Sequence, residues 1–344
     1  MQRIRIQQPG GYDVLRLETL DTPKPGPGQV LVACQACGVN YADGIIRMGL
    51  YASARELHGY PITPGFEVAG TIAAVGEGVD DWQVGDAVIG VTLFNGYASH
   101  VVLPAEGVFR KPAQLDFAQA AALPTVFLTA WWMVHRQLHA QAGERWLVHS
   151  ASGGVGSALL QLARLAGIEA IAVVGASHKV EHAKQLGAAA VIDRSQEDLW
   201  AQAEALSPEG YHAIFDANGV TTLADSYAHL APTGRLMIYG FAGMLPKDGR
   251  RNWLKLAWHW WRTPRFNPLN MTRDNRSVLA ANLSFLQAHA PTLRTGMLWL
   301  LDHFETGALQ ALPVTRFALA DADQAQRAIE SGQTVGKLIL EPWT

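Results

Sequence analysis

The sequence predicts an α/β protein in which a β-rich domain accompanies a doubly wound parallel sheet. Two observations predict this fold class: short strand-like segments recur over about the first 110 residues, and strands alternate with helices from about residue 124. The 344 residues correspond to roughly two domains, and a hydrophobic share of 49% is enough for sizeable cores. The formal net charge of −3 argues against a nucleic-acid partner, because such a partner calls for a basic surface.

The N-terminal part is expected to be a compact β domain. Turns rich in Pro and Gly, such as residues 23–28, separate segments that contain β-branched residues and recur at roughly ten-residue spacing. The expected strands cover residues 29–37, 70–76, 84–90 and 98–103.

The residues after 124 are expected to form the parallel sheet. Their strand-like runs are almost continuously apolar, which is typical of strands covered by helices on both faces. The expected strands are 145–149, 170–174, 190–193, 212–216, 235–239 and, at the edge, 266–271, with helices at 154–166, 179–186 and 223–230. The tail is expected to form helices at 277–288, 293–305 and 321–331 and strands at 313–319 and 337–340.

The longest apolar stretch, residues 117–134, is better explained by two buried helices than by a membrane span. It contains Gln119, Pro124, Thr125 and Thr129, and its length only just reaches that of a span. We expect a helix, a break at the proline and a second helix. The N-terminus has no apolar signal-peptide region, so a cytoplasmic protein is expected.

A glycine-rich turn follows the expected strand 145–149. Residues 150–156 read SASGGVG and lead into a helix, so small residues stand where a backbone has to approach a pyrophosphate. Ala151 takes the place of the first glycine of the G-x-G-x-x-G pattern. The strand–turn–helix context predicts a dinucleotide site, against the alternative of a purely structural turn. Its expected residues are Ser152, Gly153, Gly154, Val155 and Gly156.

The second strand of this unit favours the phosphorylated cofactor. NAD-binding forms carry an acid at its end, about 20 residues after the glycines, to hold the ribose 2′-hydroxyl. Residues 173–179 contain no acid, whereas Ser177, Lys179 and, after the third strand, Arg194 could contact a 2′-phosphate. We therefore expect NADPH (NADP+). The alternative is that Lys179 and Arg194 are solvated surface charges.

Short motifs spread along nearly the whole chain carry a family resemblance. They are the segments 36–43, 47–51, 64–70, 75–78, 85–86, 121–124, 128–130, 151–156 and 336–340. In sequence and order they resemble the motifs of the medium-chain dehydrogenase/reductase superfamily, and more narrowly those of the zinc-free quinone oxidoreductases. A further segment at 239–269, with an Arg-Asn-Trp run and paired tryptophans, is similar to the vesicle amine transport protein-like branch.

The resemblance implies the domain organisation. Residues 1–123 and 273–344 would form a GroES-like catalytic domain, and residues 124–272 a Rossmann nucleotide-binding domain. The cofactor would lie in the cleft between them. A homodimer would form by joining the nucleotide-binding domains edge to edge.

The chain departs from the zinc-dependent relatives at their catalytic ligands. Those relatives bind zinc with a Cys and with the His of a Gly-His-Glu motif. This sequence has Asn40 in place of the Cys and Phe66 in place of the His, and it keeps only the Glu of the motif, as Glu67. Cys34 and Cys37 are the two cysteines of the sequence, so there is no second thiolate pair with which they could bind a metal ion. In a strand their spacing would point the two side chains to opposite faces. We expect two ordinary buried thiols and no catalytic zinc.

Reduction of an electron-poor acceptor is the chemistry that suits a site without a Lewis acid. A quinone or an α,β-unsaturated carbonyl compound takes a hydride directly and delocalises the developing oxyanion, whereas oxidation of a simple alcohol is hard without a Lewis acid to stabilise the alkoxide. The protein then mainly holds the two reactants together and supplies a hydrogen bond or a proton. We expect a small apolar or aromatic substrate of this kind.

By motif position, the resemblance implies that Asn40, Asp43 and Tyr51 are catalytic and that Asn40 also contacts the cofactor. Tyr41 is an alternative to Tyr51 as donor to the acceptor oxygen, and Arg47 could orient Asp43. Two structural alternatives remain open: Asn40 could serve only as a helix cap, and Tyr51 could serve only as a packing residue. Further cofactor contacts are expected from Thr129, which would open a helix, and from Asn218, Tyr239, Phe241 and Lys337.

An insertion at about 244–265 concentrates tryptophan and basic residues. Between residues 247 and 265 there are six Lys or Arg and one Asp, which gives a local charge of +5. Three interpretations stay open: one packed helical face, a lid over an apolar substrate, or a surface for an anionic membrane. The third supplies a rival function, an NADPH-binding protein that associates with a membrane or a partner and turns over little substrate. The tryptophans are Trp253, Trp258, Trp260 and Trp261.

Overall fold

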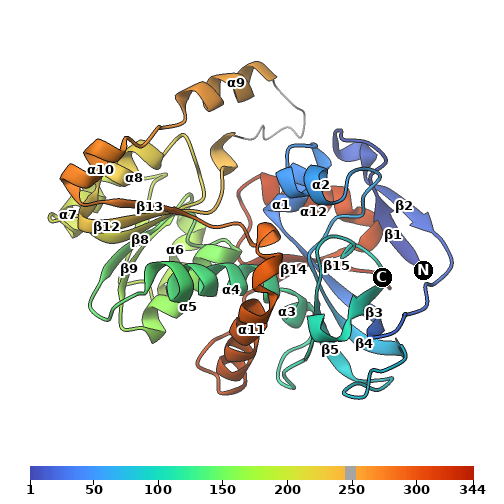
Figure 1. Cartoon of the computed structure of the whole chain (residues 1–344). Helices are drawn as coiled ribbons and strands as arrows, with labels where there is room; N and C mark the ends of the chain where they lie inside the picture. The colour runs from blue at the N-terminus through green and yellow to red at the C-terminus, as the bar shows by residue number, and fades with distance from the viewer. Residues whose placement is uncertain (245–252) are drawn as a thin grey trace. The chain divides into compact units, whose positions relative to one another are not determined.

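The computed structural model describes residues 1–244 and 253–344, and the chain divides into two compact units (Figure 1). The first unit comprises Met1–Leu128 and Ser284–Thr344. The second comprises, of the described residues, 129–244 and 253–283.

A seven-stranded sheet forms the centre of the first unit. The strand order is β14-β15-β3-β4-β5-β7, and β6 pairs with β3. The last strand is antiparallel to β3, with Leu340 opposite Cys37, so the end of the chain joins a sheet begun near its start (Figure 1). The strands are β3 (Gln29–Val39), β4 (Glu67–Val75), β5 (Ala87–Val91), β6 (His100–Pro104), β7 (Val108–Arg110), β14 (Val314–Ala318) and β15 (Lys337–Glu341), while β1 (Gln2–Arg5) and β2 (Arg16–Thr19) pair separately.

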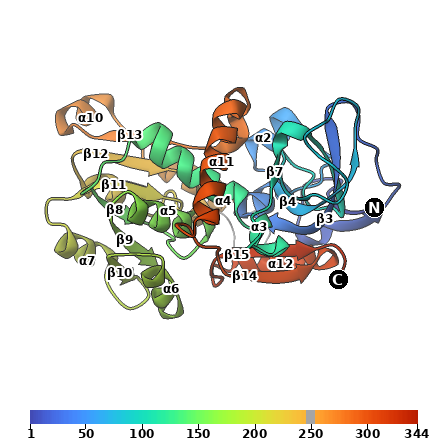
Figure 2. The same ribbon diagram turned by 90° about the horizontal axis from the view of Figure 1, so that it is seen from below.

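Helices complete the first unit. Helix α12 lies beside β14 and β15 (Figure 2) and also packs against α1. A buried ion pair of 2.8 Å between Arg47 of α1 and Glu330 of α12 links the two helices. The helices are α1 (Tyr41–Arg47), α2 (Ala52–Leu57), α3 (Phe117–Ala121), α11 (Ala290–Glu305) and α12 (Ala322–Glu330).

The second unit contains a six-stranded sheet in which every pairing is parallel. Its order is β10-β9-β8-β11-β12-β13, so the strand order reverses between β8 and β11, and the prediction of a doubly wound sheet is confirmed. The strands are β8 (Arg145–Val148), β9 (Glu169–Val174), β10 (Ala190–Asp193), β11 (Tyr211–Asp216), β12 (Leu230–Ile238) and β13 (Ser277–Ala280). Helix α4 (Pro124–Trp131) begins in the first unit and continues into the second, which starts at Thr129. The second unit also contains a π-helical segment (Trp132–Leu138) and the helices α5 (Gly154–Leu165), α6 (Val180–Gln185), α7 (Leu199–Leu206), α8 (Leu223–Ala228), α9 (Trp253–Arg262) and α10 (Pro268–Asp274).

The sixth strand of the parallel sheet lies at a different place in the sequence from the one predicted. The edge strand expected at 266–271 is instead helix α10, and the helix expected at 277–288 begins with strand β13. Asn267 accepts a hydrogen bond from the Leu269 N–H, Pro268 opens the helix, and Asn275 ends it in the left-handed region. These local start and stop signals outweigh the apolar run on which the strand prediction relied.

The apolar stretch 117–134 forms two helices as predicted, α3 and then α4 from Pro124 onward. Asp116 and Gln119 form a capping box at the start of α3. Among the residues that the structure describes, no helix has the length and apolar character needed to span a bilayer.

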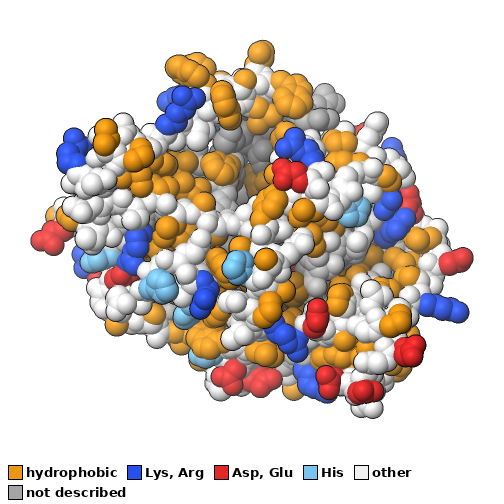
Figure 3. Space-filling view, viewed as in Figure 1, with side chains coloured by type: hydrophobic (Ala, Val, Ile, Leu, Met, Phe, Trp, Pro, Cys, Tyr) orange, Lys and Arg blue, Asp and Glu red, His pale blue; other side chains and the backbone are white. Residues whose placement is uncertain are grey.

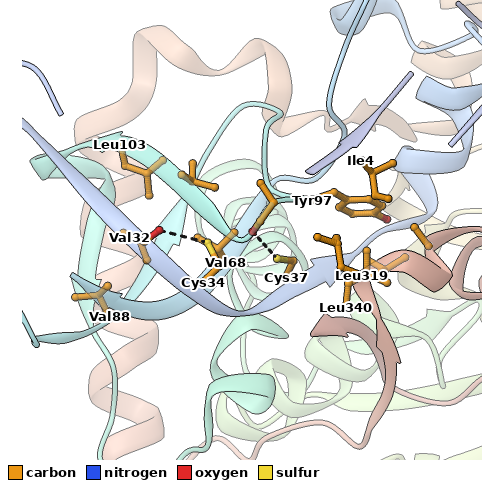
Figure 4. Close-up of a cluster of buried hydrophobic side chains, with 14 of the residues drawn as sticks. Ile4, Val32, Cys34, Cys37, Val68, Val88, Tyr97, Leu103, Leu319 and Leu340 are labelled. Atoms are coloured by element: carbon orange, nitrogen blue, oxygen red, sulfur yellow. Dashed lines mark hydrogen bonds between the residues drawn. The ribbon is translucent and has the colours of Figure 1, made fainter. Parts of the chain in front are cut away.

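The two cysteines share one core, contrary to the prediction of opposite faces. The pairing of β3 with β4 shifts register between Cys34 and Ala36, and such a bulge breaks the alternation of side chains. Both thiols are free and fully buried in the cluster that contains Val32, Val68 and Leu340 (Figure 4). Burial raises the pKa of the Cys34 thiol well above its ordinary value, which makes it an inert core group.

Candidate functional site

The glycine-rich turn lies between β8 and α5, where the sheet order reverses. A Cβ on Gly156 would lie 2.5 Å from the Ser150 carbonyl oxygen and 2.6 Å from the Ala151 Cα, so this position requires glycine. Gly153 caps α5, and a Cβ there would lie 3.3 Å from the same oxygen. The N–H groups of Gly154, Val155 and Gly156 belong to the first turn, whose donors have no acceptor within a helix. The turn thus offers the donors and the close backbone approach that a pyrophosphate needs.

Asp216, a residue that the sequence reasoning missed, organises the neighbouring loop. Its carboxylate is fully buried and accepts hydrogen bonds from the N–H groups of Asn218 and Gly219 and from the Thr222 and Ser226 hydroxyls, at 2.7–3.1 Å. The Asn218 side chain in turn accepts a hydrogen bond from Ser150 in the glycine-rich turn. The sequence did contain a signal for Asp216: it is an acidic residue at the end of an apolar strand, and small residues follow it.

Tyr239 and Phe241 follow β12 and border this loop, as their sequence positions predict. The Tyr239 N–H donates to the Asp216 carbonyl at 3.0 Å, and burial raises the pKa of its phenol. The Phe241 ring packs on Gly219, whose φ of +83° suits glycine. Asn218, Tyr239 and Phe241 therefore gather at one end of the sheet, next to the glycine-rich turn.

Two cations meet beyond the ends of β9 and β10. Lys179 is 6% exposed, and burial together with the nearby charge of Arg194 lowers its pKa. The Arg194 guanidinium lies over Gly175, 3.5 Å from where a Cβ would be. Ser177 lies beside them but donates its hydrogen bond to Asp193 at 2.6 Å, which lowers the pKa of that carboxyl. An anion between Lys179 and Arg194 would relieve their repulsion.

In the first unit, Asn40 belongs to a buried polar cluster, here called the Asn40 cluster, with Glu67, Lys337 and the N–H of Thr125. Asn40 Nδ2 donates to Glu67 Oε1 at 2.9 Å, and Lys337 Nζ lies 2.6 Å from the same oxygen. The Thr125 N–H donates to the other Glu67 oxygen at 2.6 Å. Lys337, which was expected at the cofactor, is thus an internal ion-pair partner.

Asp43 is held beside this cluster at the start of α1. Its carboxylate is fully buried and accepts hydrogen bonds from the N–H groups of Asn40 and Gly65 and from the Tyr97 hydroxyl, at 2.8, 3.1 and 2.9 Å. Burial raises the pKa of Asp43 to about 6, although these donors and the charge of Lys337 oppose the rise. Asp43 therefore fixes the backbone of Asn40 at the N-cap position of α1, while the Asn40 side chain contacts Glu67 and Lys337.

We expect Tyr97→Phe to destabilise the protein more at pH 8 than at pH 5. The pKa of Asp43 is about 6 in the folded state and about 3.9 when unfolded, so its contribution to stability is lost as the pH rises through 6. Loss of the tyrosine donor raises the folded pKa further. The expected cost is about 1–3 kcal/mol at pH 8, measured by urea unfolding, and smaller at pH 5.

Tyr211→Phe is the matched control, because its buried hydroxyl donates to the neutral Ala203 carbonyl at 2.8 Å. Its cost should be independent of pH. Equal costs of Tyr97→Phe at both pH values would contradict the role given to Asp43.

Three other candidates differ from expectation in their settings. The Arg47 guanidinium is bonded to Glu330, Gln326 and the Gly10 carbonyl, so Tyr97 takes the place next to Asp43 that was expected for Arg47. Tyr51 precedes α2, and its hydroxyl lies 2.9 Å from Ser284 Oγ. Thr129 lies in the second turn of α4, because that helix already begins at Pro124.

The tryptophan-rich helix α9 does not form a packed face. Trp253, Trp258 and Trp261 are 63%, 55% and 66% exposed, so that interpretation is wrong for this chain. Figure 3 shows hydrophobic side chains on the surface where Figure 1 places α9. The Arg262 guanidinium lies 5.8 Å from the centre of the Trp258 ring. Lys247, Arg250 and Arg251, which contribute to the local charge in the sequence, lie outside the described residues.

Fold and turn together define the class of nucleotide-dependent dehydrogenases and reductases with a β-rich domain. Two family models agree with this: residues 26–113 match an alcohol dehydrogenase GroES-like domain, and residues 154–278 match a zinc-binding dehydrogenase.

Similar proteins define the branch. The chain is 32% identical to the rat (Rattus norvegicus) synaptic vesicle membrane protein VAT-1 homolog, over 97% of this chain and 82% of that protein. It resembles the quinone oxidoreductase of Pseudomonas syringae pv. Tomato DC3000 (TM-score 0.84, 31% identity, 99% of both chains). It also resembles the Escherichia coli quinone oxidoreductase complexed with NADPH (TM-score 0.85, 26% identity, 99% of this chain and all of that one). The chain belongs to the medium-chain dehydrogenase/reductase superfamily, in its VAT-1-like quinone oxidoreductase branch, and is an oxidoreductase by family.

Proposed function

We propose that this protein is an NADPH-dependent reductase that transfers a hydride to a quinone or an α,β-unsaturated carbonyl compound without catalytic zinc. The observation that carries the choice of cofactor is the pair of cations, Lys179 and Arg194, beyond the ends of β9 and β10. A 2′-phosphate is the anion that the nucleotide brings to this part of such a sheet. The glycine-rich turn would hold the pyrophosphate, and Asn218, Tyr239 and Phe241 would border the nucleotide.

We expect Lys179→Ala and Arg194→Ala each to weaken NADPH binding by about 10–100-fold and to change NADH binding by less than about 3-fold. Loss of either cation removes a charge-assisted contact that only the 2′-phosphate makes. The measurement is the dissociation constant of each nucleotide from nicotinamide fluorescence. Lys184→Ala, an exposed lysine on α6, is the control and should change neither value. Equal losses for both nucleotides would show that the cations do not read the 2′-phosphate.

Zinc does not fit the donor set at the Asn40 cluster. Zinc ions in proteins are held by thiolate, imidazole and carboxylate groups, whereas the nearest polar side chains here are an amide, an ammonium and a single carboxylate. The ammonium of Lys337 already lies 2.6 Å from Glu67 and would repel a divalent cation. This mismatch supports the proposal of zinc-free chemistry.

The residues of the first unit suit an acceptor that needs little polarisation. When bound, NADPH supplies a hydride from its nicotinamide ring. Asn40 would donate a hydrogen bond to the oxygen on which negative charge develops, and Tyr51 or water would supply the proton that completes the reduction. Tyr51 is half-buried and hydrogen-bonded to Ser284, which fixes its hydroxyl.

A panel of quinones and enones tests the proposed function. Loss of NADPH absorbance at 340 nm, with at least one acceptor and in the presence of a chelator, is the expected result. A protein that binds NADPH but reduces no member of the panel would contradict the reductase proposal, and one whose activity disappears with the chelator would contradict zinc-free chemistry.

The remaining expectations from the family stay part of this proposal. Residues 1–123 and 273–344 would act as the catalytic domain, residues 124–272 would act as the nucleotide-binding domain, and two copies would form a homodimer in the cytoplasm. Size-exclusion chromatography with light scattering tests the dimer.

Helix α9 favours a second candidate function, association with an anionic membrane. Trp260 and Leu254 are 67% and 86% exposed, and residues 253–273 contain four Lys or Arg and no acid. Exposed tryptophans beside basic residues suit the interface of an anionic bilayer. Binding of the wild type to phosphatidylserine vesicles, lost in high salt and in Trp260→Ser/Arg262→Ser, would support it. If the protein binds phosphatidylcholine vesicles as well as phosphatidylserine vesicles, or binds neither, this second function is contradicted.

A further inference from the structure

The Lys337 ammonium is engaged by three oxygens inside the first unit. It donates hydrogen bonds to the Val39 carbonyl oxygen at 2.6 Å and to Asn40 Oδ1 at 2.7 Å. It also forms an ion pair with Glu67 Oε1 at 2.6 Å, and its side chain is 3% exposed. Lys337 is therefore a buried cation whose contacts are directed at Asn40 and its neighbours.

The same contacts determine how the Asn40 amide is turned. Glu67 can only accept from it, and Lys337 can only donate to it, so Nδ2 faces the carboxylate and Oδ1 faces the ammonium. One of the two Nδ2 hydrogens is used by Glu67, and the other remains for a substrate. Asn40 is 6% exposed, so rotation of the amide would break two buried hydrogen bonds.

Glu67 is held in turn from several sides. The Thr125 N–H binds its second oxygen, and its side chain lies over Gly38, where a Cβ would come within 2.3 Å of Oε1. Its side chain is fully buried. A buried carboxylate needs a compensating cation, and Lys337 supplies that charge.

We infer that Lys337 is a positioning residue that acts on the reaction only through Asn40, by fixing the amide so that one Nδ2 hydrogen faces the acceptor oxygen. This inference rests on the proposed reductase function. It replaces the expectation from the sequence that Lys337 touches the cofactor.

A double-mutant cycle tests the inference. Asn40→Ala, Lys337→Met and the double variant are compared with the wild type by kcat and KM for the acceptor and by the dissociation constant of NADPH. We expect each single variant to lower kcat by about 10–100-fold, the double variant to fall no further, and NADPH affinity to change less than about 3-fold. Lys111→Met is the control, because that lysine also donates to backbone carbonyls, of Pro112 and Leu115, and should keep kcat.

Two results would overturn it: multiplicative losses of kcat in the double variant, or a loss of NADPH affinity above about tenfold in Lys337→Met, which would indicate a direct contact. If Lys337→Met does not fold, the neutral variant Glu67→Gln/Lys337→Met takes its place. Asn40→Ala in that background should then cost little, and a cost as large as in the wild type would refute the inference.

A crystal structure of Lys337→Met gives a readout that is independent of turnover. A rotated or displaced Asn40 amide supports the inference, and an unchanged amide overturns it. Absence of turnover in the wild type would instead overturn the proposed function, and it is seen before any variant is made.

Discussion

Gly156→Ala is expected to weaken NADPH binding by about 100-fold, which corresponds to about 2.8 kcal/mol, while the protein stays folded. A Cβ at this position would lie 2.5 Å from the Ser150 oxygen and 2.6 Å from the Ala151 Cα, and both are backbone atoms that no side-chain rotation can move away. The turn would have to open, and the first-turn N–H groups of α5 would lose the direction that a pyrophosphate needs. Nicotinamide fluorescence measures the affinity, and circular dichroism checks the fold.

Gly153→Ala is the matched control in the same turn. Its φ of −81° suits any residue, and the new Cβ would lie 3.3 Å from the Ser150 oxygen. We expect a change in affinity of less than about fivefold, since a shift of a few tenths of an ångström relieves the contact. Equal losses in both variants would mean that the sensitivity of the turn does not arise from the close approach at Gly156.

Arg47→Met is expected to destabilise the first unit by about 3–5 kcal/mol, because it leaves a buried carboxylate without its cation. The side chains of Arg47 and Glu330 are 0% and 3% exposed, and their ion pair joins α1 to α12. The Tyr12 hydroxyl, which donates to Glu330 at 2.6 Å, would remain as partner. The measurement is the urea midpoint of the unfolding transition to which the first unit contributes.

Two variants separate the buried charge from other effects of the substitution. Arg47→Met/Glu330→Gln removes both charges and should recover a large part of the loss. Arg3→Met breaks an ion pair with Glu18 in which both side chains are about 30% exposed, and it should cost less than about 1 kcal/mol. If Arg47→Met costs no more than Arg3→Met, the buried pair does not stabilise the unit.

The nucleotide half of the site could be predicted because its signals are local. The turn at 150–156 stands directly between a strand and a helix, and strand order then places Asn218, Tyr239 and Phe241 at the same end of the sheet. Strand order likewise places Lys179 and Arg194 beyond the ends of the neighbouring strands β9 and β10.

The Asn40 cluster could not be predicted, because its members are remote in sequence. Asn40 meets Glu67 across 27 residues and Lys337 across 297. Motif position predicted roles at the reacting atoms for Asn40 and at the cofactor for Lys337. Only the three-dimensional contacts show that the Lys337 ammonium is buried against Asn40 and Glu67.

The errors in secondary structure also have physical causes. Asn267 and Pro268 start a helix where an apolar run indicated a strand, and one shifted register in β3 brings Cys34 and Cys37 into one core. The exposed tryptophans of α9 have the spacing of a buried face. Periodicity shows that one face of a helix is apolar, but not whether that face is covered by the rest of the protein.

The pairing of β15 with β3 has a consequence for biosynthesis. The Asn40 cluster cannot close until residue 337 has left the ribosome, whereas all six strands of the parallel sheet have been made by residue 280. During synthesis the Glu67 carboxylate has no ammonium partner, and β3 presents an open edge where β15 will pair. The nascent chain is therefore expected to acquire its nucleotide fold before its reductive chemistry, and the newly made first unit is the part most in need of a chaperone.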